Sequence, residues 1–374
     1  MSGQKISDAK NAAIELISKL NPSDRFGLVT YSDTARLMSN LVFVTTDAQA
    51  RLSAMINNIS ASGGTNLGQG LQAGIDTLAF SQKTGNTGRL ILISDGLANK
   101  GVTDINALGK MASVAVQKEF SISTAGVGND FNETLMTAIA DYGTGNYYFM
   151  ENPAAFASVF NNEFEHTRSV AAGSVRICLN EQNGIKFVGA GGYPVIRENG
   201  AAVFYPGDIR SGETRKLFLS LQVPTDRVTT FDIPGISIQY RNNDDSYRVA
   251  LPDNLKLSCV SDPSDAMASI DKKTWENKVL QEDFSRLKEK VAADLRKGRQ
   301  AEAVQKIEAY YDNQQAINAG VGSAAIAKNL DHDLLELRNT VDETFTGKPS
   351  AVAEKQKKNA KVLQFEGYRE RRKN

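Results

Sequence analysis

The chain has 374 residues, with 43 Lys and Arg against 43 Asp and Glu, 41% hydrophobic residues, 2 Cys and 2 His. This length predicts two or three domains, and a net charge of zero disfavours a dedicated nucleic-acid-binding protein, which needs a basic field. No stretch has the roughly 18 consecutive apolar residues of a membrane span, and the chain does not open with an apolar export signal. Two cysteines and two histidines, widely separated, cannot supply a zinc site or a disulfide-rich scaffold.

Residues 1–170 alternate short apolar runs with segments of helical spacing. This pattern is typical of an α/β domain with a doubly wound, mostly parallel sheet and helices on both faces. The apolar run at 89–94 predicts a central strand, and the strands at 25–31 and 37–45 predict an antiparallel hairpin. The expected elements are helices at 6–20, 47–59, 66–80, from 104, from 132 and at 153–170, and strands at 25–31, 37–45, 89–94, 121–127 and 146–150.

From about residue 171 the apolar residues alternate with polar ones, and polar turns separate the segments. We expect residues 171–261 to form an antiparallel β-sandwich. Cys178 and Cys259 lie near its first and last strands, so a disulfide and two separate small thiols are both compatible with the sequence.

The remaining chain has helical spacing, and we expect a helical bundle over residues 262–346 and a basic tail over 347–374. Residues 348–374 hold 9 Lys and Arg against 3 Asp and Glu, a local net charge of +6. A solvated, frayed terminus is the expected state of this tail, and contact with an acidic partner or an anionic membrane surface is the alternative. The sequence shows no internal repeat.

Two loops at the predicted carboxyl edge of the parallel sheet carry oxygen ligands. Ser62-Gly63-Gly64-Thr65-Asn66 precedes a helix, and Ser94-Asp95-Gly96 follows the apolar strand. Open α/β sheets place ligand sites at this edge, and a hydroxyl and a carboxylate are hard ligands of the kind Mg²⁺ selects. Taken alone, Gly-Gly-Thr is more typical of a loop before a helix N-cap, and Asp-Gly of a turn.

The order of these motifs resembles that of von Willebrand factor A domains, including those of multidomain bacterial proteins. Gly63-Gly64-Thr65-Asn66 and the strand end Ile93-Ser94-Asp95-Gly96 resemble the second and third motifs of that family's metal-ion-dependent adhesion site. Residues 123–128 and 145–149 resemble two later strands of the family. The resemblance covers residues 1–170 and implies the same fold there.

The family's first motif, Asp-x-Ser-x-Ser on the first central strand, is missing from this sequence, which opens Met1-Ser2-Gly3-Gln4-Lys5. We expect a longer natural protein whose upstream residues supply that strand. A sheet without it would leave buried backbone groups unpaired, at a cost of about 1–3 kcal/mol for each group. The alternative is a protein that lacks the strand and a competent metal site.

The resemblance implies that Thr65 and Asp95 bind Mg²⁺, or Mn²⁺ or Ca²⁺, directly or through water. It also implies that an acidic side chain of a protein ligand completes the coordination. With only these two ligands, we expect metal binding by the chain as written to be weak or lacking. Asp33 and Asp130, also at strand ends, are outer candidates.

We therefore expect a divalent-cation-dependent protein-binding module without enzymatic activity, and the alternative is a metal-independent structural or scaffold protein. Neither His166 nor His332 has an identifiable Ser or Cys partner for a hydrolase, and the sequence has no Gly-x-x-x-x-Gly-Lys phosphate loop. The resemblance favours the cell envelope, the periplasm or the extracellular space if an upstream signal exists, and the cytoplasm otherwise.

Overall fold

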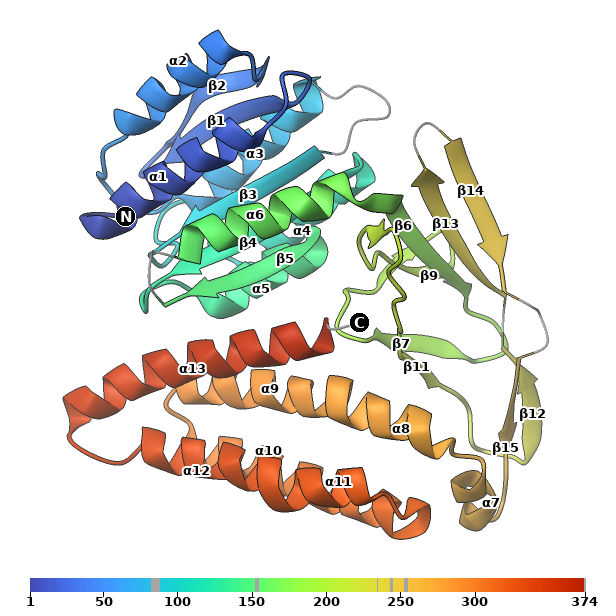
Figure 1. Cartoon of the computed structure of the whole chain (residues 1–374). Coiled ribbons are helices and arrows are strands. Elements are labelled where there is room, and N and C mark those ends of the chain that lie inside the picture. The colour runs from blue at the N-terminus through green and yellow to red at the C-terminus, as the bar shows by residue number, and fades with distance from the viewer. Residues whose placement is uncertain (82–87, 152–154, 234, 243–244, 252–254, 373–374) are drawn as a thin grey trace. The chain divides into compact units, whose positions relative to one another are not determined.

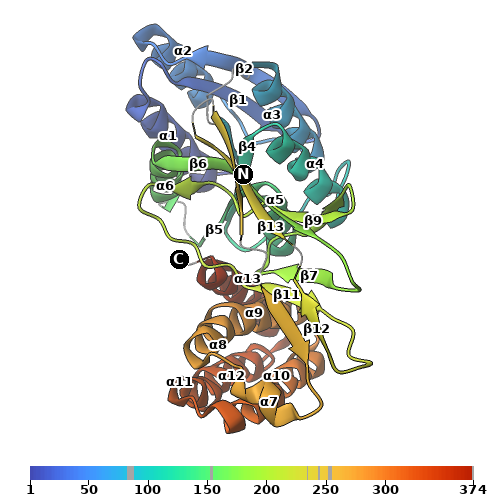
Figure 2. The same cartoon turned by 90° about the vertical axis from the view of Figure 1, so that its right-hand side faces the viewer.

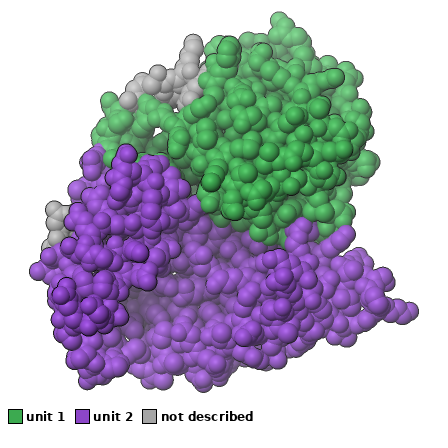
Figure 3. All heavy atoms as spheres, turned by 180° about the vertical axis from the view of Figure 1, so that it is seen from behind, with its two compact units in different colours: residues 1–176, 205–213, 239–247 green, residues 177–204, 214–238, 248–374 purple. Residues whose placement is uncertain are grey.

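The computed structural model describes residues 1–81, 88–151, 155–233, 235–242, 245–251 and 255–372. The chain forms two compact units (Figure 3). Unit 1 comprises residues 1–176, 205–213 and 239–247, and unit 2 comprises residues 177–204, 214–238 and 248–374. Within the described residues, no helix combines the length and the apolar character needed to cross a membrane.

Unit 1 has the alternating strand and helix order that the sequence predicts (Figure 1). Side chains cap several of its helices, as when Asp104 accepts a hydrogen bond from the backbone of Ala107. Of the expected last helix, 153–170, the start lies outside the described residues. The elements are α1 (Gln4–Lys19), β1 (Arg25–Tyr31), β2 (Ala35–Phe43), α2 (Thr46–Asn57), α3 (Leu67–Ser81), β3 (Gly88–Ser94), α4 (Ile105–Gln117), β4 (Phe120–Val127), α5 (Glu133–Tyr142), β5 (Thr144–Met150) and α6 (Phe156–Arg168).

The strands of this α/β region form two separate sheets. β3, β4 and β5 pair in parallel in that order, and β1 and β2 form the expected antiparallel hairpin. These pairings confirm the parallel sheet, but the prediction that residues 89–94 form the central strand is wrong. β3 is an edge of the described three-stranded sheet and is partly exposed along most of its length, whereas β4 is buried throughout. No described strand pairs with the second edge of β3, so β3 is covered less completely than β4.

Helices cover both faces of the two sheets. α1 and α6 lie on one side and α3, α4 and α5 on the other (Figure 2). α1 packs on β4 and β5 through Ala9 and Ala12, and on the β1–β2 hairpin and α2 through Ile17. On the opposite side α3 contacts β1, β2 and β3. Apolar packing of α1 and α3 therefore joins the two sheets where strand pairing does not.

The following residues form antiparallel sheets, as the sequence predicts. One sheet has the order β14-β13-β6-β9-β8 with β10 on β6, and two further pairs are β11-β7 and β12-β15. The two cysteines lie on strands of different sheets, Cys178 on β6 and Cys259 on β15, and no disulfide joins them to each other. The strands are β6 (Val170–Asn180), β7 (Lys186–Ala190), β8 (Ile196–Glu198), β9 (Ala201–Phe204), β10 (Ile209–Arg210), β11 (Leu219–Gln222), β12 (Thr229–Asp232), β13 (Ile236–Asn242), β14 (Asp245–Ala250) and β15 (Lys256–Cys259).

The last part of unit 2 is helical, and its core consists mainly of Leu, Val, Ile and Ala side chains. Two π-helical turns, η2 and η3, interrupt it. The elements are α7 (Pro263–Ala268), α8 (Lys272–Lys278), η2 (Val279–Asp283), α9 (Phe284–Arg296), α10 (Gln300–Val321), α11 (Ala324–Lys328), η3 (Asn329–Asp333), α12 (Leu334–Thr344) and α13 (Pro349–Arg371).

The basic tail is not frayed, so that expectation is wrong. Residues Pro349–Arg371 form α13, which packs along α9 and buries Ala360, Leu363 and Tyr368. Lys355 also donates hydrogen bonds to the backbone carbonyls of Glu343 and Thr346. A cation at this position is favourable because the carbonyl groups at the end of α12 carry partial negative charge. The high charge of these residues therefore led to the wrong expectation of a frayed tail, although they form an amphipathic helix.

The helical region contains a repeat that the sequence analysis missed. η2 is followed directly by α9, and η3 is followed directly by α12. Each residue of the first pair has its counterpart 50 positions later in the second pair. Leu287 and Leu337 are buried at equivalent places, as are Val291 and Val341. The longer helices α10 and α13 complete the two halves. Few residues are identical between the halves, so the repeat is visible in the element order rather than in the sequence.

A buried ion pair fixes α6 to the parallel sheet. The Glu163 side chain is 1% exposed, and its Oε2 lies 2.9 Å from Nη1 of Arg89 on β3. Its Oε1 accepts hydrogen bonds from Asn146 Nδ2 at 2.9 Å and Tyr148 Oη at 2.7 Å, both on β5. Burial favours the neutral acid, but Arg89 and these hydrogen bonds outweigh it and lower the pKa of Glu163 below its ordinary value.

We predict that Glu163→Gln destabilises unit 1 by about 3 kcal/mol at neutral pH, because buried Arg89 would lose its nearest carboxylate and keep the more distant one of Asp208, at 3.6 Å. The pKa of Glu163 is lowered in the folded state, so its stabilisation is full above the ordinary value of 4.5 and disappears as the pH falls through the folded pKa. The difference in stability between the wild type and Glu163→Gln should therefore become smaller at acidic pH. Hydrogen exchange of backbone amides in β3 and β5 measures this stability within the intact chain. Glu165→Gln, an exposed position on the same helix, is the matched control; equal effects of both variants would contradict the prediction.

Candidate functional site

The loop before α3 is held by hydrogen bonds to two other loops. The backbone N–H of Gly64 donates to Oδ1 of Asp33 at 2.9 Å, and that of Thr65 donates to Oδ1 of Asn99 at 2.9 Å. Gly63 has φ +71°, and a Cβ there would lie 2.7 Å from Oδ2 of Asp33. Only glycine fits this position without strain, because its backbone is left-handed and the Asp33 carboxylate occupies the space of a side chain.

The loop after β3 meets the Thr65 loop. A Cβ on Gly96 would lie 3.2 Å from Oγ1 of Thr65, so this hydroxyl lies against the backbone that follows Asp95. The backbone N–H of Asn99 donates to the carbonyl of Thr65 at 3.1 Å, and buried Ser94 donates from Oγ to the carbonyl of Gly96 at 3.2 Å. The structure thus brings together the two loops that carry the predicted metal ligands, Thr65 and Asp95.

Two ammonium groups lie at the Asp95 carboxylate, whose side chain is 22% exposed. The α-amino group of Met1 lies 3.0 Å from Oδ1, and Nζ of Lys5 lies 3.9 Å from Oδ2. The chemistry of Thr65 and Asp95 suits a hard cation, but Mg²⁺ requires six oxygen ligands. In residues 1–374 a hydroxyl and a carboxylate with two ammonium neighbours are therefore only a partial fit to a metal ion.

A buried tyrosine connects the Asp95 end of β3 to the hairpin. Tyr31 on β1 donates from Oη to the carbonyl of Ile93 at 2.6 Å. Burial raises the pKa of Tyr31 to about 12; a hydrogen bond with Ser94 opposes this rise, and the Asp95 carboxylate adds to it. Tyr31 therefore stays a neutral donor at physiological pH and keeps this link.

The outer candidates differ in their places. Asp33, in the turn between β1 and β2, contacts the Thr65 loop through the hydrogen bond from Gly64, which gives it a structural role there. Asp130 is exposed in the loop between β4 and α5. The sequence analysis missed Asn99, Tyr31 and Lys5. The polar run Asn99-Lys100-Gly101 after Asp95 could have indicated a role for Asn99. Tyr31 and Lys5 could not be found in this way, because their contacts join segments that are distant in the sequence.

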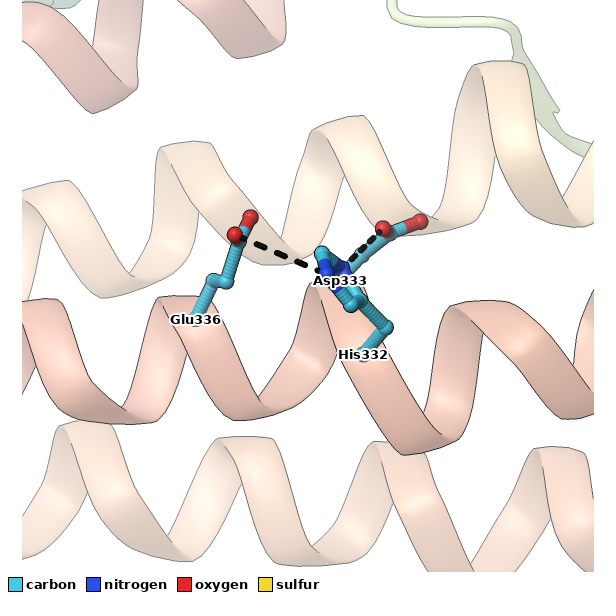
Figure 4. Close-up of side chains that lie close together, drawn as sticks. All are labelled: His332, Asp333 and Glu336. Atoms are coloured by element: carbon cyan, nitrogen blue, oxygen red, sulfur yellow. Dashed lines mark hydrogen bonds and ion pairs between the residues drawn. The ribbon is translucent and has the colours of Figure 1, made fainter.

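A second group of metal-ligand types lies on the helical region (Figure 4). Nδ1 of His332 is 3.3 Å from Oδ1 of Asp333, and its Nε2 is 3.9 Å from Oε1 of Glu336. His332 lies on η3, and its side chain is 62% exposed. Because these side chains are exposed and engage one another, we assign them no site.

Sequence comparison identifies the fold of the N-terminal region. The von Willebrand factor type A domain family matches residues 1–162. The uncharacterised Escherichia coli protein YfbK is 31% identical over 186 residues, which are 47% of this chain and 31% of YfbK. The pig inter-alpha-trypsin inhibitor heavy chain H1 is 30% identical over 136 residues, 35% of this chain and 15% of that protein. The chain thus spans less than a third of the length of these curated relatives.

The solved structures give the same result. The protein described as von Willebrand factor type A from Catenulispora acidiphila superposes with a TM-score of 0.70 over 97% of this chain and 84% of that one, at 15% identity. This likeness shows a shared fold. Together with the family match and the paired loops at the carboxyl edge of the parallel sheet, it confirms the resemblance seen in the sequence. Residues 1–162 of this chain form a von Willebrand factor type A domain.

Proposed function

We propose that this protein binds another protein through the edge of its A domain that carries Thr65 and Asp95, without catalysing a reaction. Domains of this family often act in protein interactions. The observation that carries the proposal is the meeting of the Thr65 and Asp95 loops, which Asn99 holds by hydrogen bonds. The loop after Asp95 also exposes two apolar side chains, Leu97 (50%) and Val102 (44%), whose burial against a partner would be favourable.

The finer proposal is that binding depends on a divalent cation such as Mg²⁺. Thr65 and Asp95 would hold the ion, and an acidic side chain of the partner would complete its coordination. The ion would supply a positive charge between the Asp95 carboxylate and the acidic side chain of the partner. Thr65 and Asp95 would position it. Further oxygen ligands beyond Thr65 and Asp95 are required for tight binding.

A metal-independent scaffold is the second candidate, and one observation favours it. The ammonium group of Lys5 lies 3.9 Å from Oδ2 of Asp95 and balances part of its charge, so this carboxylate has a cationic neighbour without a metal. In this case an acidic partner would contact Lys5 and the apolar side chains of the Asp95 loop directly. For both candidates, and on the resemblance alone, we propose the cell envelope, the periplasm or the extracellular space as the location if an upstream signal exists, and the cytoplasm otherwise.

We predict weak Mg²⁺ binding by residues 1–374, with a dissociation constant of about a millimolar or higher, because two ligands leave most of the coordination to water. Isothermal titration calorimetry of the chain with Mg²⁺ and Mn²⁺ measures it. Asp95→Asn should abolish the residual binding, and Asp76→Asn, a change at an exposed position on α3, is the matched control. Submicromolar binding by residues 1–374 would contradict this prediction.

A second experiment separates the two candidates. We predict that a chain extended ahead of Met1 by a strand with Asp-x-Ser-x-Ser gains about 2.7 kcal/mol of stability at a Mg²⁺ concentration a hundredfold above its dissociation constant. Thermal unfolding with and without the ion measures this gain. Thr65→Ala and Asp95→Ala should remove it, and an extension with Ala in place of the Asp and Ser residues is the control. A fully folded extended chain without any cation-linked gain would favour the scaffold.

A further inference from the structure

Unit 2 contains a small pocket whose lining includes four cationic side chains. Four positive residues, Arg215, Lys216, Arg371 and Arg372, surround it together with Tyr193 and a single carboxylate, Glu282. Its volume is about 20 Å³. A cavity needs roughly 10–15 Å³ to hold one water, and pockets for organic cofactors are of the order of hundreds of Å³. Only a small ion or the end of a small group therefore fits.

The two arginines are fixed in place by their surroundings. The Arg371 side chain is 2% exposed, and its Nε lies 2.9 Å from Oε1 of Glu289 on α9. Gly192 has φ +95°, and a Cβ there would lie 2.5 Å from Nη1 of Arg371, so the glycine makes room for the guanidinium. The guanidinium of Arg372 lies over the Tyr193 ring at 4.1 Å. These rigid groups lose little freedom on binding an anion, since packing already orders them.

Glu282 gives the pocket a second chemical property. The residue is 6% exposed, and its Oε1 accepts a hydrogen bond from Nε of Arg286 at 3.2 Å. Its Oε2 has no hydrogen-bond partner among the residues that the structure describes, and it lies 3.9 Å from the position of a Cβ on Gly191. Burial raises the pKa of Glu282, and the nearby Arg286 and Lys278 only partly oppose this. A buried carboxylate oxygen of this kind is stabilised by a ligand that donates an O–H or N–H to it.

We propose that this pocket binds inorganic hydrogen phosphate. Arg371 and Arg372 balance the charge of the anion, and Oε2 of Glu282 accepts a hydrogen bond from its P–O–H group. A guanidinium has five N–H donors in a planar fork, so the ion pair of Arg371 with Glu289 is compatible with a further oxyanion. Only part of the anion enters the pocket, because the volume is small.

The carboxylate explains why phosphate is favoured over other anions of its size. Hydrogen phosphate keeps a proton at neutral pH and can donate it in a hydrogen bond, whereas sulfate has none. A sulfate oxygen would meet Oε2 of Glu282 with two acceptors and no hydrogen between them, which is unfavourable in a buried place. A phosphate monoester, whose second pKa is about 6, loses its O–H above that pH and then, like sulfate, has no hydrogen to donate to Glu282.

Calorimetric titration of the full chain with inorganic phosphate, sulfate and phosphoserine tests this proposal slightly above neutral pH, at constant ionic strength. We expect phosphate to bind at least tenfold more tightly than the other two. Arg372→Gln should weaken phosphate binding by about ten- to a hundredfold, because it removes one charged hydrogen bond to the anion. Arg369→Gln, an exposed cation on the same helix outside the pocket, should change nothing.

The variant Glu282→Gln tests the discrimination itself. Gln has the shape of Glu, can still accept the hydrogen bond from Arg286 and offers an N–H to the anion. We expect it to bind phosphate and sulfate with similar affinity, and circular dichroism with thermal unfolding verifies that it folds. Equal binding of phosphate and sulfate by the wild type would overturn the proposal, as would an affinity that neither Arg372→Gln nor Glu282→Gln changes. Phosphoserine binding as tightly as phosphate would overturn the assignment to the free ion.

Discussion

The arrangement of unit 1 depends on how two sheets are joined without a shared strand ladder. Among the described residues, β1 and β3 have no backbone pairing with each other, and every residue of β1 is partly exposed. Helices α1 and α3 cross from one sheet to the other and bury apolar side chains on both. Tyr31 adds a hydrogen bond from β1 to the carbonyl of Ile93 on β3. Among the described residues, apolar packing of α1 and α3 therefore joins the two sheets, and such contacts specify register less than strand pairing because they are not directional.

This constraint reaches the candidate site, because the site draws on both sheets. Asp33 belongs to the turn of the hairpin, Thr65 to the loop before α3, and Asp95 to the end of β3. The hydrogen bonds from Gly64 to Asp33 and from Thr65 to Asn99 link these three segments. A shift of one sheet against the other would separate Thr65 from the Asp95 loop. The same contacts that hold the domain together thus set the spacing of its oxygen ligands.

The sequence predicts those features that depend on local pattern and motif order. The strands of the parallel sheet and the two loops follow from apolar spacing and from the order of Gly64-Thr65 and Asp95-Gly96, and the structure brings those loops together. The composition of β3 indicates a central strand, but the absence of the family's first strand from this sequence already indicates that one edge of β3 lacks a partner within residues 1–374, and no described strand pairs there. The helix α13 was missed because its Lys and Arg residues dominate its composition, although Ala360, Leu363 and Tyr368 form a buried stripe. Local charge says little about a helix whose apolar face meets a distant partner.

The groups around Asp95 bear on the choice between the two proposed functions. A divalent ion in direct contact with an oxygen lies at about 2.0–2.1 Å and carries twice the charge of an ammonium group, so it interacts more strongly with the carboxylate. It must first displace the Lys5 ammonium group and lose water, and Thr65 and Asp95 alone replace little of that water. Each further carboxylate or hydroxyl near Thr65 favours the metal. The number of oxygen ligands at this edge, rather than the fold, therefore determines whether the domain uses a cation.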